Sequence, residues 1–332
     1  MSRFFTPARA AALTVAAIVV GASACSPGGG GGGGGGSAEN FPDENIDIVV
    51  PFSAGGPTDT ITRLVGEPMG DELGVQMVVQ NVEGAGGTVG AGQVAADRPD
   101  GYSILMHHIG MSTAPALYDD LAYDPVKDFE PIGLVTELPM TIISRSDLPP
   151  TTLDELIAYL KDNKGVTFGN AGVGSASQLC GTLFKEATGT DFQEVPYDGS
   201  GPAIADLVGG QIDFMCDQTP NTMGQIEAGE VKAFAVTTPE RLEMLPDLPT
   251  TAEAGLADFE ISSWHALYAP AKTPKDVVEK LRAALESALA DQGVIDQMGD
   301  LGTSPVPADQ VNPEAVSTRL KEQIDQWSDV LS

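Results

Sequence analysis

The chain has 332 residues, 42% of them hydrophobic, which is enough to build a sizeable core and suggests two lobes of ordinary domain size. Lys and Arg number 17 against 47 Asp and Glu, so the net charge is −30. A surface this acidic repels phosphate backbones, which argues against nucleic acid as a partner. Any anionic ligand must therefore be held by local donors against an unfavourable overall field.

The N-terminal segment reads as a signal for export. A basic start and an apolar run over residues 10–20, too short to span a bilayer of about 30 Å, predict a signal peptide over residues 1–24. Small residues before Cys25 resemble the lipobox of bacterial lipoproteins, in which that cysteine is acylated; an ordinary secretory signal with an incidental cysteine is the alternative. The unbroken glycine run over residues 28–36 predicts a flexible tether. We expect residues 25–44 to be a lipid anchor and tether for a domain outside the cell membrane.

From Asn45 onward, short β-rich runs alternate with amphipathic helical patterns, which predicts parallel βαβ units. Near the end, apolar residues spaced for one helix face predict helices over Val277–Leu289 and Val316–Leu331. The expected strands cover residues 46–50, 76–79, 102–106, 166–168, 192–195, 212–215 and 233–236.

Proline-rich breaks divide the chain. They fall at residues 149–150 and 246–251, so the middle of the chain can form one lobe while the two outer parts build the other. The predicted boundaries give lobe 1 residues 45–142 and 255–332, and lobe 2 residues 143–254.

Two cysteines remain in the folded part, Cys180 and Cys216. In an oxidising compartment they can pair, or they can be small buried hydrophobic residues. We expect unpaired burial, because the sequence does not show whether their Cα atoms come within about 7 Å.

The first of three glycine-containing turns covers residues 51–59, between a strand and a helix. Its adjacent glycines leave backbone N–H groups at a helix N-terminus, where they and the helix dipole attract a carboxylate or phosphate. Thr58 can cap this helix. Asp59 either stabilises the first turn of the helix, or it faces the ligand and selects for a cationic or hydroxyl group beside the bound anion. Pro68 should kink or end the helix.

The other two turns differ in what they indicate. Residues 83–88 nearly spell a dinucleotide fingerprint, but Val89 stands where a glycine is needed, and no Gly-Lys-Ser/Thr motif follows any glycine loop. Residues 168–177 lie between a strand and a helix, with Asn170 at the strand end and serines at the helix start. Capping and ligand binding coexist there, because both use the same helix N-terminus.

Many short sequence stretches of this chain resemble those of a known family and follow one another in the same order. They include residues 50–56 with Asp59, 84–90, 99–102, 123–129, 195–197, 206–213, 248–255 and 262–264. From about Ile46 to about Pro307, the chain resembles the Bug family of extracytoplasmic solute-binding proteins, the TctC-like receptors of tripartite tricarboxylate transporters.

The resemblance implies an α/β fold, the two-lobe periplasmic-binding-protein fold of type II, with a ligand cleft between the lobes. It also implies a small carboxylate as ligand, held by the first and third turns. Family members usually carry histidine where this chain has Gln178, so no histidine role is carried over there. The candidate ligand-binding residues on these turns are Ser53, Ala54, Gly55, Gly56, Thr58, Asp59, Asn170, Gly172, Gly174 and Ser175.

Five further residues at strand ends or loops are expected to flank the cleft. Tyr197 and Asp217 are the stronger candidates, and His107, His108 and His265 are the weaker ones. Because neighbours on a strand face opposite ways, at most one of His107 and His108 should face inward.

The resemblance further implies membrane transporter subunits of the TctA and TctB type as partners, and an extracytoplasmic location. We expect a lipid-anchored monomer without cofactor or metal. The alternative is a hydrolase-like or metal-dependent enzyme of the cell envelope. It is disfavoured because Asp198 precedes Gly199-Ser200-Gly201 where a nucleophile elbow needs glycine, and the three histidines match no standard metal-ligand spacing. An adhesin or structural lipoprotein would need no helix starts that face a cleft.

Overall fold

The computed structural model describes residues 40–331, so the predictions for the signal peptide, for Cys25 and for most of the tether concern residues outside this range. No helix among the described residues is long and apolar enough to cross a membrane. In chain order the elements are β1 Ile46–Val50, α1 Pro57–Leu73, β2 Met77–Asn81, the 3₁₀ turn η2 Ala85–Gly87, α2 Thr88–Ala96, β3 Ser103–His108, α3 Gly110–Leu117, β4 Phe129–Arg145, α4 Leu153–Asp162, β5 Thr167–Asn170, α5 Ala176–Thr188, β6 Gln193–Pro196, α6 Ser200–Val208, β7 Phe214–Gln218, α7 Thr219–Glu227, β8 Val231–Val236, β9 Ser262–Pro270, α8 Lys275–Ala290, α9 Gln292–Asp300, the 3₁₀ turn η3 Ala308–Gln310 and α10 Pro313–Leu331.

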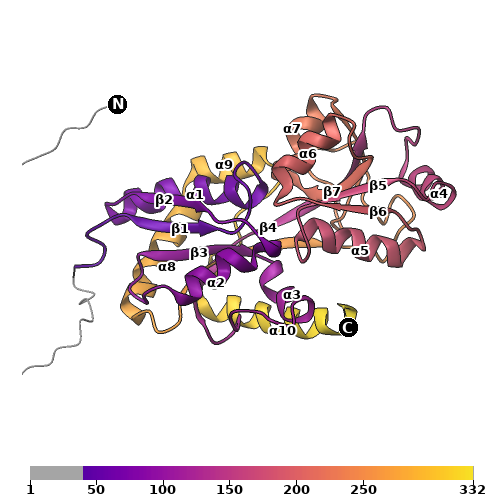
Figure 1. Cartoon of the computed structure of the whole chain (residues 1–332). Coiled ribbons are helices and arrows are strands. Elements are labelled where there is room, and N and C mark those ends of the chain that lie inside the picture. Colours follow the sequence, from indigo (N-terminus) through magenta and orange to yellow (C-terminus); the bar gives the residue numbers. More distant parts are fainter. Residues whose placement is uncertain (1–39, 332) are drawn as a thin grey trace, which may run out of the picture. The chain divides into compact units, whose positions relative to one another are not determined.

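The strands of the described chain form one path in the order β2-β1-β3-β9-β4-β7-β5-β6, with β8 pairing β4. Strand β1 is parallel to β2 and β3, and β5 is parallel to β6 and β7. Strand β9 is antiparallel to β3 and β4. This is the α/β fold that the sequence predicts (Figure 1). We call the elements around β1, β2, β3 and β9 lobe 1, and those around β5 to β8 lobe 2. The residue boundaries 142/143 and 254/255 stay a prediction.

The C-terminal helices pack on lobe 1. Helix α8 packs against α1 and β4, and α10 packs against α3 and β4. Their apolar faces, which the sequence spacing predicts, are buried at Leu281, Leu285, Leu320 and Trp327. Figure 1 shows these yellow helices beside the indigo and purple elements of the N-terminal part.

Two strands were not predicted, β4 and β9, and β4 is 17 residues long. The pattern of β4 misleads because most of its residues are buried, so polar and apolar positions do not alternate, and because Pro131 and Pro139 argue against a central strand. Strand β4 pairs with β9 as far as Pro139, and with β7 and β8 beyond it. One continuous strand therefore belongs to both lobes.

Helix α1 does not end at Pro68, contrary to the prediction, but continues to Leu73. Ile61, Val65 and Met69 are fully buried on the face that packs in the core. We infer that this burial outweighs the backbone hydrogen bond that a proline removes.

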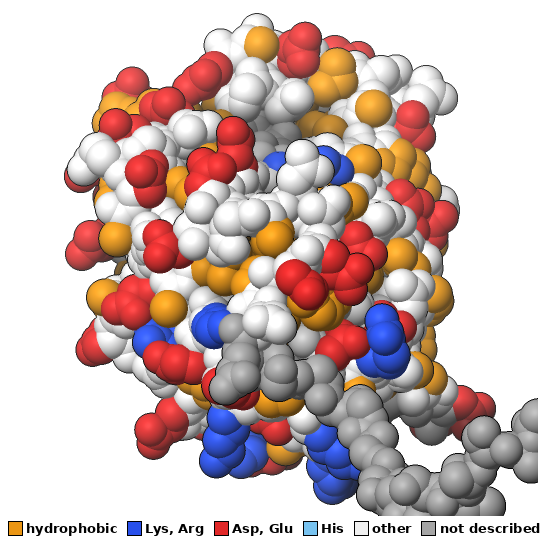
Figure 2. Space-filling model, turned by 90° about the vertical axis from the view of Figure 1, so that its left-hand side faces the viewer, with side chains coloured by type: hydrophobic (Ala, Val, Ile, Leu, Met, Phe, Trp, Pro, Cys, Tyr) orange, Lys and Arg blue, Asp and Glu red, His pale blue; other side chains and the backbone are white. Residues whose placement is uncertain are grey.

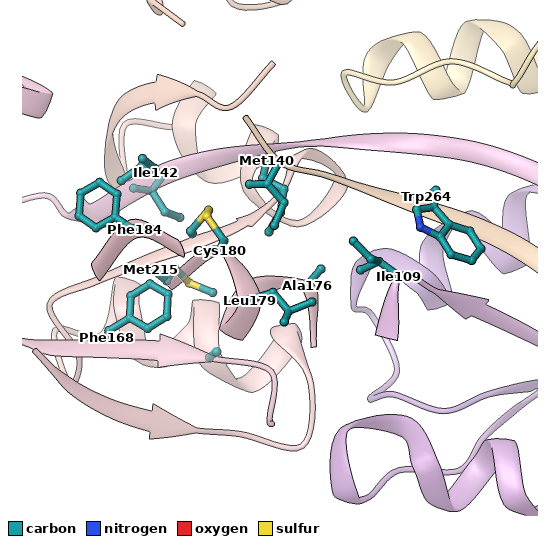
Figure 3. Close-up of a cluster of buried hydrophobic side chains, with 14 of the residues drawn as sticks. Ile109, Met140, Ile142, Phe168, Ala176, Leu179, Cys180, Phe184, Met215 and Trp264 are labelled. Atoms are coloured by element: carbon teal, nitrogen blue, oxygen red, sulfur yellow. A yellow bond between two sulfur atoms is a disulfide. The ribbon is translucent and has the colours of Figure 1, made fainter. Parts of the chain in front are cut away.

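Cys180 and Cys216 form a disulfide, so the expectation of unpaired cysteines was wrong. The fold packs α5 on β7, which brings the two Cα atoms to 6.1 Å, inside the range that a disulfide needs. Figure 3 shows Cys180 and its bond among Phe168, Phe184 and Met215 in the hydrophobic core. The disulfide therefore joins the two elements of lobe 2 that carry Ser175 and Gln218 at their ends.

Figure 2 shows how charge is distributed over one face of the molecule. Asp and Glu side chains are scattered over the whole of this face, and the fewer Lys and Arg side chains gather mostly in its lower part. On this face the acidity is spread out and does not form a single block.

Candidate functional site

Two neighbouring cavities lie where the lobes meet. The smaller one, of ≈10 Å³, is lined by both predicted turns, and the larger one, of ≈240 Å³, shares Phe52 and Ala171 with it. The structure thus brings together two turns that are more than a hundred residues apart in the chain. The smaller cavity is lined by Phe52, Gly56, Pro57, Thr58, His108, Ala171, Ser175, Ala176, Ser177, Ser200 and Gln218.

Four helices begin at the smaller cavity. Gly56 is the N-cap of α1, Ser175 that of α5 and Gln218 that of α7, while Ser200 is the first residue of α6. Each helix start contributes partial positive charge. No Lys or Arg is among the described residues that line either cavity. The site is therefore suited to an anion held by neutral donors.

Three of the backbone donors that the sequence suggested already have acceptors within their own turns. The N–H of Gly55 donates to Asp59 Oδ2 (2.9 Å), that of Gly172 to Asn170 Oδ1 (3.0 Å), and that of Gly174 to Gln178 Oε1 (3.2 Å). These three groups are occupied because each turn is braced by its own side chains. That Gly55, Gly172 and Gly174 contact the ligand stays a prediction.

The first turns of two helices supply open donors instead. Within the described chain, the N–H groups of Thr58 and Asp59 in α1, and of Ala176 and Ser177 in α5, have no hydrogen-bond acceptor. Such groups are normally left free at a helix N-terminus. Ser175 caps α5 through its hydroxyl, which accepts a hydrogen bond from the N–H of Gln178.

Asp59 stabilises its own turn. Its carboxylate accepts hydrogen bonds from Arg63, Asn81 and the N–H of Gly55. Burial by itself would raise the pKa of Asp59, but these bonds outweigh it and hold the pKa below its usual value. Asp59 is not among the residues that line the two cavities. Of the two roles open for Asp59, the contacts favour the stabilising one.

Two buried polar atoms near the cavity lack a partner among the described residues, Ser53 Oγ and Gln218 Oε1. Gln218 is 3% exposed and lines the smaller cavity, and its amide can present either oxygen or NH₂. An unpaired buried polar group costs about 1–3 kcal/mol, so its presence indicates a place for a ligand. The sequence reasoning missed Gln218 and named Asp217 beside it; the Pro220 that follows, a common residue at a helix start, was the available signal.

Asp217 lies behind the cavity. It is fully buried and accepts hydrogen bonds from Ser200 Oγ (2.9 Å) and Asn221 Nδ2 (2.6 Å). Burial raises the pKa of Asp217 to about 6, which its hydrogen bonds only partly counteract. Asp217 therefore holds Ser200 at the start of α6.

The three histidines cluster on β3 and β9, because His108 pairs with His265 in the ladder. Only His108 lines the smaller cavity, where its ring stacks on Phe52 at 4.4 Å. His265 Nδ1 lies 3.1 Å from the Ser263 carbonyl, which makes Nε2 the acceptor for the Thr58 hydroxyl at 3.0 Å. Thr58 consequently does not cap α1, contrary to the prediction.

Burial sets the charge of these histidines. It lowers the pKa of His265 to about 3 and that of His107 to about 4, and lowers that of His108 as well. The cluster is therefore neutral at pH 7. Residues 40–331 contain no group of three or more side chains arranged to hold a metal ion.

The remaining candidates lie around the larger cavity or outside it. Tyr197 lines the larger cavity, and its hydroxyl donates to Asp206 Oδ2 (2.7 Å). Asn170 braces the third turn through Gly172. Ala54 is exposed and lines neither cavity.

Several known proteins are similar to this chain in sequence and fold. A protein of Agrobacterium vitis, described as a UPF0065 protein in the TAR-I ttuE-ttuC' intergenic region, is 50% identical over 295 residues, which is 89% of this chain and 85% of the relative. The structure of the periplasmic binding protein BugD has 49% identity and a TM-score of 0.85, and the match covers 87% of this chain and 97% of BugD.

Two further structures contain ligands. MatC from Rhodopseudomonas palustris with bound malate has 39% identity and a TM-score of 0.85 over 88% of this chain and all of MatC. R. palustris Rpa4515 with adipate has 31% identity and a TM-score of 0.83 over 87% of this chain and 97% of Rpa4515. These matches confirm the two-lobe periplasmic-binding-protein fold.

The family model described as the tripartite tricarboxylate transporter family receptor, TctC, matches residues 61–331. The structural neighbours are periplasmic solute-binding proteins, not enzymes. With the fold, the paired turns and these relatives in agreement, the chain belongs to the TctC family of solute-binding receptors.

Proposed function

We propose that this receptor captures a small dicarboxylate between its lobes. The observation that carries the proposal is the convergence of four helix N-termini on one cavity that Gln218 also lines. The amide oxygen of Gln218 is unpaired, and the amide turned over presents its NH₂ group to a carboxylate. Malate and adipate, which the relatives MatC and Rpa4515 bind, are both dicarboxylates.

One carboxylate group would lie at the smaller cavity and the rest of the ligand in the larger one. A space of ≈10 Å³ suits a single polar group, whereas ≈240 Å³ accommodates a short chain. The open N–H groups of Thr58, Ala176 and Ser177, which line this cavity, would donate to the carboxylate. Each charge-assisted hydrogen bond contributes about 1.5–3 kcal/mol, and each helix dipole a further ~0.3–1 kcal/mol. These local donors outweigh the distant acidic surface, whose field is largely screened beyond about 8 Å at physiological salt.

The test is titration calorimetry with malate, adipate, a monocarboxylate and a tricarboxylate. Gln218→Ala should weaken binding of the best ligand about tenfold or more, because a buried ligand oxygen loses its partner. The exposed Gln193→Ala is the matched control and should bind as the wild type does. No binding of any carboxylate, or equal affinity in the Gln218 and Gln193 variants, would contradict the proposal.

We also propose that Cys25 carries a lipid anchor and that the receptor delivers its ligand, as a monomer, to membrane subunits of the TctA and TctB type. The glycine run after Cys25 and the family description support this. Cys25→Ser should move the protein from the membrane fraction to the soluble fraction and remove the acyl mass from the N-terminal peptide. An unchanged distribution and peptide mass would exclude the anchor.

A further inference from the structure

The lobes touch along a seam beside the larger cavity. The hydroxyl of Tyr118, the residue after α3, donates to the carbonyl oxygen of Val173 at 2.8 Å. Within α3, the Thr113 hydroxyl reaches the carbonyl of Gly174 at 3.3 Å. Both acceptors belong to the turn that leads from β5 into α5.

Gly86 in η2 makes the seam possible. Its φ is +62°, and a Cβ there would lie only 1.7 Å from Val173 O and 2.9 Å from the Tyr118 hydroxyl. No side chain fits into that space, because the obstructing atom belongs to the backbone. The seam therefore forms only when residue 86 is glycine and the lobes are closed.

We propose that Tyr118 and Gly86 are positioning residues that hold the lobes closed on the ligand and so set its residence time. The inference rests on the proposed function, since it concerns the same cleft. The seam and the ligand site are connected, because the turn that contains Val173 leads directly to Ala176 and Ser177, which line the smaller cavity. The residues of the seam, Gly86, Tyr118 and Val173, also line the larger cavity, so parting the seam opens that cavity.

A contact that exists only in the closed state adds to closed-state affinity and slows release, while encounter with the open state is unaffected. Weakening the seam should therefore raise the dissociation rate constant without lowering the association rate constant. Weakening a residue that only supports the fold would not raise the dissociation rate constant selectively.

Gly86→Ala is the sharper variant. Its matched control is Gly189→Ala, which has the same φ of +62° but nothing within 4 Å of the added Cβ. Both variants should lose similar stability from left-handed backbone strain. Only Gly86→Ala should bind malate, or the best carboxylate found, about 10- to 100-fold more weakly, as expected for an overpacked contact.

Tyr118→Phe removes one hydrogen bond without changing the shape of the side chain. Dissociation measured by stopped flow should be about three- to tenfold faster than in the wild type. Tyr102→Phe is the control, because it removes the hydrogen bond to Asp43 far from the cleft. Equal dissociation rates in the wild type and Tyr118→Phe would overturn the role of Tyr118.

Small-angle scattering separates this inference from the proposed function, because it needs no ligand. The ligand-free Gly86→Ala protein should have a larger radius of gyration than the wild type and Gly189→Ala. If no carboxylate binds the wild type, the proposed function fails, yet this difference still decides whether the seam holds the lobes closed. Identical radii for the three proteins would overturn the inference.

Discussion

Neighbouring residues at the end of β7 have different surroundings. Gln218 lines the smaller cavity with an unpaired amide, whereas Asp217 is held by Ser200 and Asn221 behind it. Asp217 has no cationic partner among the described residues, which is why burial dominates its pKa. A buried acid of this kind affects stability as well as position.

Asp217→Asn should change how stability depends on pH. The pKa of Asp217 is about 6 in the folded protein and 3.8 ordinarily, so the protonated acid stabilises the fold below pH 3.8 and this stabilisation is lost as pH rises through 6. Relative to the wild type, the variant should therefore gain about 2 kcal/mol between pH 4 and pH 7. Loss of the Asn221 hydrogen bond shifts this difference equally at all pH values.

Urea unfolding at several pH values measures that difference, with the exposed Asp198→Asn as control. The comparison with the wild type cancels the histidines, whose lowered pKa values make stability fall as pH drops below about 6.5. A stability difference that is the same at pH 4 and pH 7 would show that Asp217 does not titrate in this range.

The sequence predicts part of this chemistry. Ser175 caps α5 as expected, because serine before an amphipathic run is a local signal. For Gln218 the sequence offered only the helix-start signal of Pro220, since which neighbour faces the cavity depends on the register of β7 against β4, and β4 itself was not predicted. The occupied N–H groups of Gly172 and Gly174 were equally hidden, because their acceptors depend on how the turn folds back on itself.

Helix α5 and strand β7 are the elements that carry most of lobe 2's share of the smaller cavity. The disulfide between Cys180 and Cys216 fixes them to each other, one turn into α5 and two residues before Gln218. Both sulfur-bearing side chains are buried. The register between the start of α5 and the end of β7 is therefore set covalently.

Replacing both cysteines by alanine should reduce the free energy of unfolding by about 3–4 kcal/mol. The disulfide closes a loop with a sequence separation of 36, and its loss releases the entropy of that loop in the unfolded chain. Urea unfolding of the double variant measures the effect. An oxidised wild type that is no more stable than the double variant would contradict it.

Among the strands, those that the sequence predicted differ in pattern and pairing from those that it did not predict. Parallel strands next to helices were found within a few residues, because helix and strand periods alternate there. Strand β9 and the proline-containing β4 lack such a pattern, and their pairing joins segments more than a hundred residues apart. The predicted lobes thus lacked the strands that connect them.

At the scale of the whole molecule, the net charge of the chain is −30. The face in Figure 2 shows acidic side chains throughout. Dispersed like charges repel one another in the folded state more than in the expanded chain. We interpret this acidity as an adaptation of solubility to high salt, separate from the ligand site.

Potassium chloride should therefore stabilise the protein. Raising it from 0.01 to 1 M shortens the screening length from about 30 to 3 Å. The melting temperature should rise by at least about 3 °C, equivalent to roughly 2 kcal/mol for a chain of this size. Calorimetric scans at pH 7 measure it, and the rise should shrink at a pH closer to the isoelectric point. A melting temperature that stays flat or falls would refute the interpretation.

The continuity of β4 has a mechanical consequence. Any change in the angle between the lobes must bend a strand that is hydrogen-bonded to β9 on one side of Pro139 and to β7 and β8 beyond it. A slack linker would let the lobes swing freely, whereas a paired strand resists bending and exerts a restoring force. We therefore expect any opening of the lobes to bend β4 near Pro139, where the ladder changes partners.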